Sequence, residues 1–177
     1  AKKHNLKVIE DCAQCIGGKY KDTMVGLVGD VGCYSFCQSK HFTTGGEGGM
    51  VITNNEDLAW ECRSFRDHGY DVRTRMNMLA LEAKLPYIHR RVGFNYRITE
   101  MQAALGISQL KRLDWSIERR NEIAKKYDEA FKGTAVKTPF RAEGLVHAFH
   151  LYIIQVEPAK RKGLYDFLRA NNVYSQV

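Results

Sequence analysis

The order of the expected strands and helices predicts an α/β fold, in which a mixed sheet layer is followed by the start of a smaller α+β unit. Two observations support this prediction. Short apolar runs bounded by Gly or Asn fill the first third of the sequence, as in buried strands. Long helical patterns begin near residue 99, and another β-type run and a helix follow them. We therefore expect one large domain over residues 1–133 and the beginning of a small domain over residues 134–177.

The first part of the sequence contains three expected strands and one expected helix. The strands are the apolar runs at residues 6–9, 32–36 and 49–53. Asn54 or Asn55 is then expected to cap a helix over residues 56–65. The next stretch, residues 69–93, is irregular, rich in Arg and interrupted by Pro86.

The second half is expected to be mainly helical. Thr99 followed by Gln102 has the pattern of a capped helix start. Apolar residues then recur at near-helical spacing, at Met101, Leu105, Ile107, Leu110 and Leu113. The remaining expected elements are a helix at residues 117–131 ended by Gly133, a strand at 151–156, a break at Pro158 and a helix at 161–170.

The composition excludes several classes of protein. With 44% apolar and 27% charged residues among 177, the chain is neither disordered nor collagen-like. No apolar run reaches the roughly 18–20 residues of a membrane span. The first residues carry no apolar leader, so we expect a cytoplasmic protein. Five cysteines, an odd number, are then expected to be reduced thiols.

Two residues stand out by their position relative to the expected strands. Asp11 ends the first strand, and Lys40 follows the second strand just before a glycine-rich run, residues 45–49. In open α/β sheets the ends of strands converge on the ligand crevice. Pyridoxal phosphate chemistry requires a Lys for a Schiff base and a carboxylate beside the pyridine nitrogen. The alternative interpretation is a capping Asp and a surface Lys.

Four stretches in order carry a family resemblance, at residues 8–14, 35–40, 46–51 and 93–104. Together they resemble the DegT/DnrJ/EryC1/StrS family of pyridoxal-phosphate-dependent sugar aminotransferases. The resemblance implies the aspartate-aminotransferase-like (type I) fold, with the second half of its large domain and the start of its small domain present. It also implies the transfer of an amino group from an amino acid, such as glutamate, to a keto-sugar. The expected keto-sugar is linked to a nucleotide.

The resemblance implies a role for each matching residue. Lys40 matches the Schiff-base lysine and proton shuttle, and Asp11 matches the carboxylate that pairs with the pyridinium nitrogen. The expected further cofactor ligands are Gln14 for the ring hydroxyl and Ser35 for the phosphate. Asn95 is expected to bind the phosphate of the cofactor held in the neighbouring subunit. Asn95 thereby implies a homodimer with shared active sites. Arg97 is expected at the substrate side, with a structural salt bridge as the alternative.

Two departures from the family pattern qualify the resemblance. A branch of the family that dehydrates a deoxysugar places His at the position of Lys40, and here His41 is its neighbour. The spacing from Ser35 puts Lys40 in the critical position, which favours a transaminase over a sugar dehydratase. The family's chains are also about twice as long, so the sequence is expected to be the central part of such a chain.

Two interpretations from other classes compete with the enzyme. Cys12/Cys15 and Cys33/Cys37 resemble zinc-ligand pairs, but positions i and i+4 of one strand lie about 13 Å apart. A tetrahedral site needs every sulfur about 2.3 Å from one metal, so no metal site is expected. The net charge of +7 invites nucleic-acid binding. The basic clusters are scattered and alternate with acids, so neither nucleic acid nor membrane is an expected partner. His147 and His150 have no ligand spacing, and a structural role is expected for His150.

Overall fold

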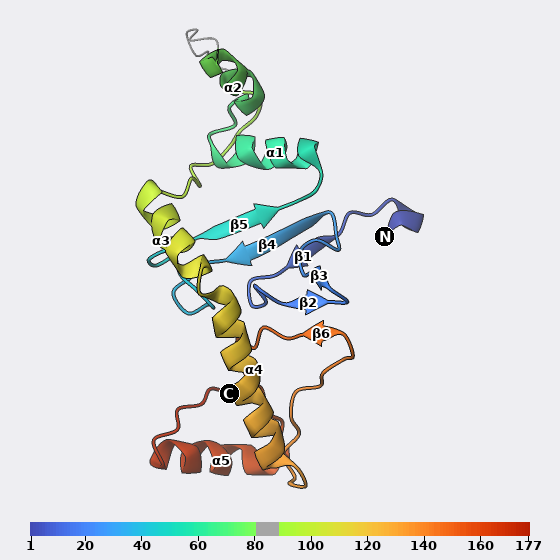
Figure 1. Ribbon diagram of the computed structural model, residues 1–177, viewed down its shortest axis with the longest axis vertical. Helices are drawn as coiled ribbons and strands as arrows, with labels where there is room; N and C mark the ends of the chain where they lie inside the picture. Colours follow the sequence, from blue (N-terminus) through green and yellow to red (C-terminus); the bar gives the residue numbers. More distant parts are fainter. Residues whose placement is uncertain (81–88) are drawn as a thin grey trace.

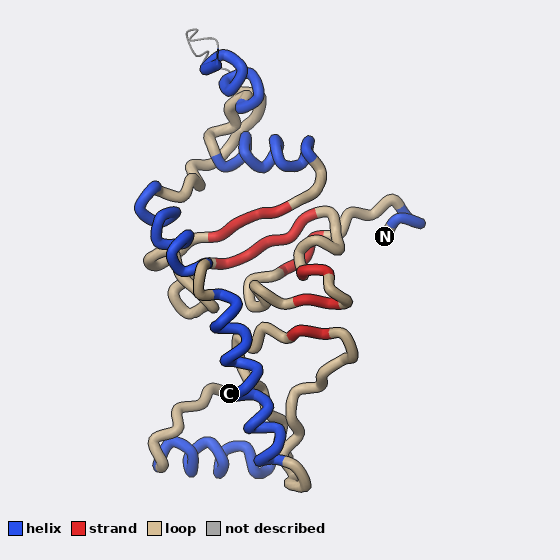
Figure 2. The backbone as a smooth tube through the Cα atoms, in the orientation of Figure 1, coloured by secondary structure: helices blue, strands red, loops and turns tan. Residues whose placement is uncertain are grey.

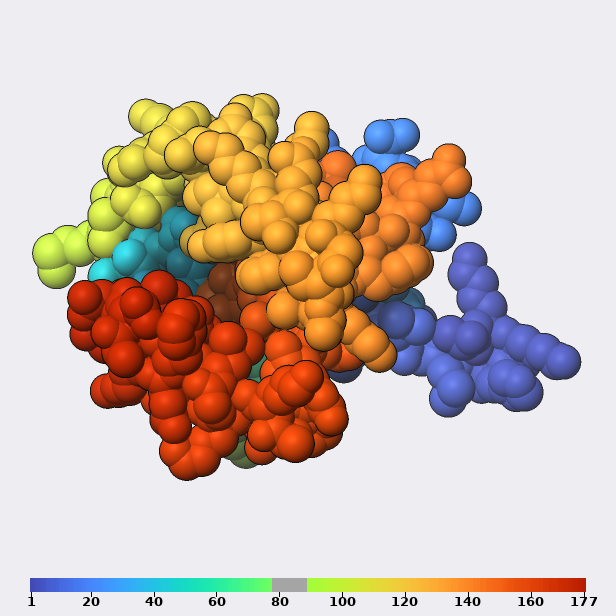
Figure 3. Space-filling model, turned by 90° about the horizontal axis from the view of Figure 1, so that it is seen from below, coloured from blue at the N-terminus to red at the C-terminus, as the bar shows by residue number. Residues whose placement is uncertain are grey.

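The computed structural model describes residues 1–80 and 89–177. It is an elongated α/β structure, with α2 at one end, a central sheet, and α5 at the other end (Figure 1). A long helix, α4, runs from the sheet to the α5 end (Figures 1 and 2). The first residues project from the body as a short arm (Figure 3).

The central sheet has three strands, β1 (Ile9–Asp11), β4 (Val31–Ser35) and β5 (Gly49–Ile52), in the order β1-β4-β5. β1 is parallel to β4, and β4 is antiparallel to β5. Asp11 pairs with Cys33 in this register. The carboxyl ends of β1 and β4 therefore lie at the same edge, as the sequence predicted.

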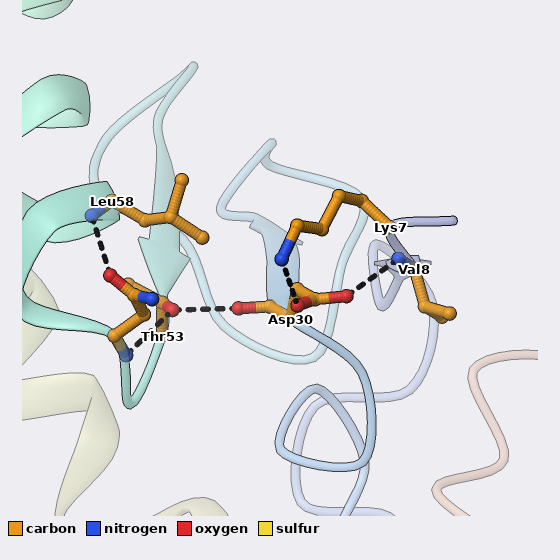
Figure 4. A network of polar contacts seen from close by, with 6 residues as sticks. Lys7, Val8, Asp30, Thr53 and Leu58 are labelled. Atoms are coloured by element: carbon orange, nitrogen blue, oxygen red, sulfur yellow. Dashed lines mark hydrogen bonds and ion pairs between the residues drawn. The ribbon is translucent and has the colours of Figure 1, made fainter. Parts of the chain in front are cut away.

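The opposite edge of this sheet is fixed by a polar network centred on Asp30 (Figure 4). The Asp30 carboxylate accepts a hydrogen bond from the Val8 backbone at 2.8 Å and contacts the Lys7 ammonium at 3.3 Å. The Asp30 carbonyl accepts one from the Thr53 hydroxyl at 2.6 Å. One residue thus joins the start of β1, the start of β4 and the end of β5.

A second small sheet was not expected from the sequence. It consists of β2 (Lys19–Tyr20), β3 (Thr23–Met24) and β6 (Leu145–Val146) in the antiparallel order β3-β2-β6. Strands of two residues are too short to produce a recognisable alternation. β6 pairs with β2 across more than 120 residues of sequence, so it brings the 145–153 segment back to the strand-end loop that follows Asp11.

The prediction of a strand at residues 151–156 is wrong. Only Gln155 forms a bridge, through two backbone hydrogen bonds of 2.9 Å with Lys137. A strand needs hydrogen-bonded partners along its length, and the rest of this segment finds none in the described part of the chain. Its apolar side chains Leu151 and Ile153 instead line a cavity.

The helices follow the predicted order with three corrections. They are α1 (Glu56–Arg66), α2 (Val72–Ala80), α3 (Glu100–Leu110), α4 (Leu113–Phe131) and α5 (Pro158–Ala170), after a short 3-10 turn η1 (Lys2–His4). α4 begins four residues earlier than expected. Pro158 starts α5 instead of breaking the pattern, since a first-turn proline loses no helical hydrogen bond.

α2 occupies a stretch that was expected to be irregular. Its start has a helix-capping pattern that is visible in the sequence. The Asp71 carboxylate accepts hydrogen bonds from both the backbone N–H and the hydroxyl of Thr74. Arg90 also pairs with this buried Asp71 at 2.6 Å. Pro86 lies outside the described residues.

The core lies between the central sheet and α4. Its buried residues are Cys12, Tyr34, Phe36, Phe42, Leu113, Ile117 and Ala148. Cys12 follows Asp11 directly, and Phe36 and Phe42 flank the Lys40 loop, with their rings stacked at 4.7 Å. The packed core therefore fixes both segments that carry the predicted catalytic residues. None of the helices in the described ranges is long and apolar enough to cross a membrane.

Candidate active site

A cavity of about 480 Å³ opens beside the carboxyl end of β1. Two segments distant in sequence form its walls. Its lining residues are Asp11, Ala13, Gln14, Cys15, Pro139, His147, His150, Leu151 and Ile153. The strand-end loop after β1 supplies one wall, and the 139–153 segment supplies the other.

Asp11 and Gln14, two of the residues expected to bind the cofactor, both line this cavity. Asp11 is the last residue of β1, and one of its carboxylate oxygens accepts the Ala13 backbone N–H at 3.0 Å. That bond holds the carboxylate over the turn and leaves its other oxygen available to a ligand. Backbone hydrogen bonds from Cys12 to Cys33 and from Cys15 to Cys12 fix the turn, so Gln14 faces the same space.

Ser35 and Lys40 lie on the segment that leaves β4. The Ser35 hydroxyl accepts the Cys37 backbone N–H at 3.3 Å, and the Lys40 backbone N–H donates to the Cys37 carbonyl at 2.9 Å. Lys40 is half-buried in this turn. Burial lowers the pKa of His150 in the cavity wall, and the positive charge of Lys40 lowers it further. Lys40 is not one of the residues that line the cavity.

The glycine run after Lys40 folds the loop back onto the sheet. Gly45 and Gly46 have φ of 90° and 127°, a region that side chains disfavour. A Cβ at Gly48 would stand 2.2 Å from the Thr44 hydroxyl oxygen, and Thr44 is fully buried. The glycines thus serve close packing and the return to β5.

Asn95 and Arg97 are not among the residues that line this cavity. Asn95 forms a bridge with Asp67 at the end of α1, and the Arg97 guanidinium pairs with the same Asp67. Asp67 also approaches Arg75 at 3.8 Å. The structure therefore shows Arg97 in the salt bridge that the sequence offered as its alternative role. A function of Asn95 in a neighbouring subunit stays a prediction.

Three histidines near the cavity were not predicted as site residues. His147 and His150 line it, and His41 is buried behind the Lys40 turn. The His147 Nδ1 accepts the Phe149 backbone N–H at 2.8 Å. Burial lowers the pKa of all three rings, that of His41 to about 4. Their spacing along the chain is not that of a ligand set, because they meet only through tertiary structure.

One of the cysteines, Cys12, is buried, and the other four are half-buried. Burial raises the pKa of the Cys12 thiol to about 12, so it is not a reactive thiolate at neutral pH. All five cysteines are unpaired. Across residues 1–80 and 89–177, no three His, Cys, Asp or Glu side chains are grouped to hold a metal ion.

Comparison with known proteins identifies the class first. The structure superposes on an aminotransferase from Brucella abortus with a TM-score of 0.87 and 35% identity, covering all of this chain and 43% of the other. It matches S. venezuelae DesV, solved with a ketimine intermediate, with a TM-score of 0.83 and 30% identity, over 97% of this chain and 42% of that one. The fold is thus that of these aminotransferases.

The sequence then defines the family. The profile of the DegT/DnrJ/EryC1/StrS aminotransferase family matches residues 1–177. The GDP-perosamine synthase of Caulobacter vibrioides is 38% identical over 158 residues, which cover 88% of this chain and 39% of that protein. The chain belongs to the DegT/DnrJ/EryC1/StrS aminotransferase family, and it spans less than half the length of the relatives it matches.

Proposed function

We propose that this chain carries the catalytic centre of a sugar aminotransferase that uses pyridoxal phosphate. It would move an amino group from an amino acid, glutamate in our proposal, to a nucleotide-linked keto-sugar in the cytoplasm. One observation supports this most strongly. The Asp11 carboxylate and the Lys40 turn follow parallel neighbouring strands and therefore lie at one edge of the sheet, where Asp11 lines the cavity.

The residues present fit the cofactor. A cavity of about 480 Å³ is within the size range of small-molecule sites. Its wall offers a carboxylate with one uncommitted oxygen, at Asp11, and an amide, at Gln14. The Ser35 hydroxyl at the end of β4 engages its own turn only as an acceptor, so its O–H remains available to a phosphate oxygen. When bound, pyridoxal phosphate supplies an electron sink for the carbon that bears the amine.

Each side chain then has a defined task. Asp11 would pair with the ring nitrogen of the cofactor and hold a proton on it. Gln14 would orient the ring through its hydroxyl group, and Ser35 would hold the phosphate. Lys40 Nζ would bind the cofactor covalently and, once released, move the proton to and from the amine carbon. The stacked rings of Phe36 and Phe42 hold the two ends of the Lys40 turn together.

We also propose a homodimer. Asn95 lies outside the cavity of its own chain, next to Asp67, so it can act as a phosphate ligand only in the cavity of another subunit. Arg97 in its salt bridge would hold the Asn95 segment in place rather than contact substrate. Exposed apolar side chains on α3 offer a surface for association.

The Lys40 assignment is tested by covalent trapping. The chain is incubated with pyridoxal phosphate, reduced with borohydride, digested and mapped by mass spectrometry. We expect the label on Lys40, its loss in Lys40→Ala, and its retention in Lys125→Ala, which removes an exposed lysine of α4. Added glutamate should abolish trapping in the wild-type chain. Labelling of another lysine, or of Lys40→Ala to the same extent, would contradict the proposal.

A further inference from the structure

The ring of His41 joins the Lys40 turn to the opposite wall of the cavity. Its Nε2 lies 3.0 Å from the carbonyl oxygen of Ala148, a residue 107 positions later in the chain. A carbonyl only accepts hydrogen bonds, so Nε2 carries the proton. Only 9% of His41 is exposed, and burial lowers its pKa to about 4. The ring is therefore neutral at pH 7, and its Nδ1 is an unprotonated acceptor.

That acceptor has no partner within the described residues, and neither does its neighbour. The Nδ1 atoms of His41 and His150 are both buried without a hydrogen bond. The two rings lie side by side, with centroids 5.5 Å apart and planes inclined by 47°. Buried polar atoms of this kind are usually satisfied by an internal water. A water between the two rings that donates to His41 Nδ1 can accept from His150 when His150 carries its proton on Nδ1. With the proton on His150 Nε2, the same water would have to donate to both rings.

This choice of tautomer decides what His150 presents to the cavity. With Nδ1 protonated, Nε2 is a lone-pair acceptor. The backbone of His150 is held in place, since the Arg120 guanidinium donates to the Phe149 carbonyl at 2.8 Å and approaches the His150 carbonyl at 3.4 Å. These contacts fix the position of the His150 backbone in the cavity wall.

We propose that His41 is a positioning residue, which through one buried water holds His150 as the Nδ1–H tautomer with Nε2 as an acceptor in the cavity wall. The use of that acceptor rests on the proposed function. It would receive a hydrogen bond from a donor of the substrate, such as a sugar hydroxyl or the amine that is transferred. His41 thereby links the Lys40 turn to the residue that orients the group Lys40 acts on.

The test is the tautomer of His150 in the cofactor-free chain, read from the ring 15N resonances of histidine-labelled protein near pH 7.5. In the wild type we expect the Nδ1–H form for His150 and the Nε2–H form for His41. His41→Phe keeps the ring volume but removes the acceptor, and it should abolish the Nδ1–H preference of His150. His41→Gln keeps a donor and an acceptor and should retain most of it.

Two controls keep the outcome clear. Ser64→Ala removes a hydroxyl that is also buried and without a partner in the described residues, but that lies on α1, away from the cavity. It should leave the His150 resonances unchanged. If His41→Phe unfolds the chain, the wild-type tautomer and His41→Gln still decide the matter. An Nε2–H form of His150 in the wild type, or an Nδ1–H form that persists in His41→Phe, would overturn the proposal. Because no cofactor or turnover is involved, this result is independent of the labelling of Lys40.

Discussion

At the scale of single residues, Glu10 shows how one carboxylate shapes the site without touching a ligand. It precedes Asp11 in β1, and its two oxygens accept three backbone N–H groups, from Gly26 at 2.8 Å, Val28 at 2.8 Å and Gly29 at 2.6 Å. Burial raises the pKa of Glu10, but the three hydrogen bonds outweigh it and the net pKa is lowered. The carboxylate thus ties β1 to the loop that leads into β4.

The lowered pKa of Glu10 predicts acid-sensitive stability. A carboxyl whose folded pKa lies below its unfolded value stabilises the fold above the unfolded value, near 4.5, and loses that contribution as pH falls through the folded pKa. Glu10→Gln should lower the free energy of unfolding by about 1–3 kcal/mol at pH 7. The difference from wild type should shrink as pH is lowered from 7 toward 3 and below, because the wild-type carboxyl becomes protonated as pH falls through its folded pKa.

Denaturant unfolding at both pH values checks this prediction. Glu118→Gln, on the exposed side of α4, removes the same charge without breaking a hydrogen bond and should change little. An equal loss for the two variants, or a Glu10→Gln deficit that is constant from pH 7 to pH 3, would contradict the assignment.

At the scale of elements, α3 is the helix whose start is best defined. The Thr99 hydroxyl accepts the Gln102 backbone N–H at 3.2 Å, and the Gln102 side chain accepts the Thr99 N–H at 3.0 Å. The same Gln102 side chain donates to the Glu47 carbonyl at 3.2 Å. The cap therefore fixes α3 to the glycine-rich loop that follows Lys40.

Removing the cap should loosen both elements. Thr99→Ala is expected to lower stability by about 1 kcal/mol, since it leaves a backbone donor at the helix start without its side-chain acceptor. Thr99→Ser keeps the hydroxyl and should stay within a few tenths of wild type. Denaturant unfolding measures the loss, and faster hydrogen exchange at the first turn of α3 would locate it. Equal stability of the two variants would count against the cap.

The capping box and the strand-end position of Asp11 were predictable because each depends on residues close in sequence. α2 also carried a local signal, in the Asp71–Thr74 pair, that the irregular composition around it concealed. The cavity wall was not predictable in this way. His41 meets Ala148, and β6 meets β2, through contacts separated by more than 100 residues, and single side chains at such distances leave no periodic pattern.

At the scale of the whole molecule, the central sheet and α3 leave much apolar surface uncovered. On α3, Met101 is 83% exposed and Ile107 62%, although both fall on the predicted apolar face. An apolar hollow of about 330 Å³ separates α3 from the sheet, with Phe36 and Leu110 in its lining. Met101 and Ile107 therefore do not belong to the internal core of the described residues. Contiguous apolar surface of this kind is typical of an interface.

The proposed homodimer can be tested on this surface. The double variant Met101→Glu, Ile107→Glu should weaken self-association at least tenfold, because burying one large apolar side chain contributes about 1.5–3 kcal/mol and about 1.4 kcal/mol is a factor of ten in Kd. Phe140→Glu is the matched control, since Phe140 is 87% exposed in a loop outside α3. Sedimentation velocity over a wide concentration range separates the cases. If Phe140→Glu disrupts association equally, α3 is not the surface that joins two chains. If the wild type stays monomeric throughout, Asn95 has no second cavity to reach, and the proposed homodimer is wrong.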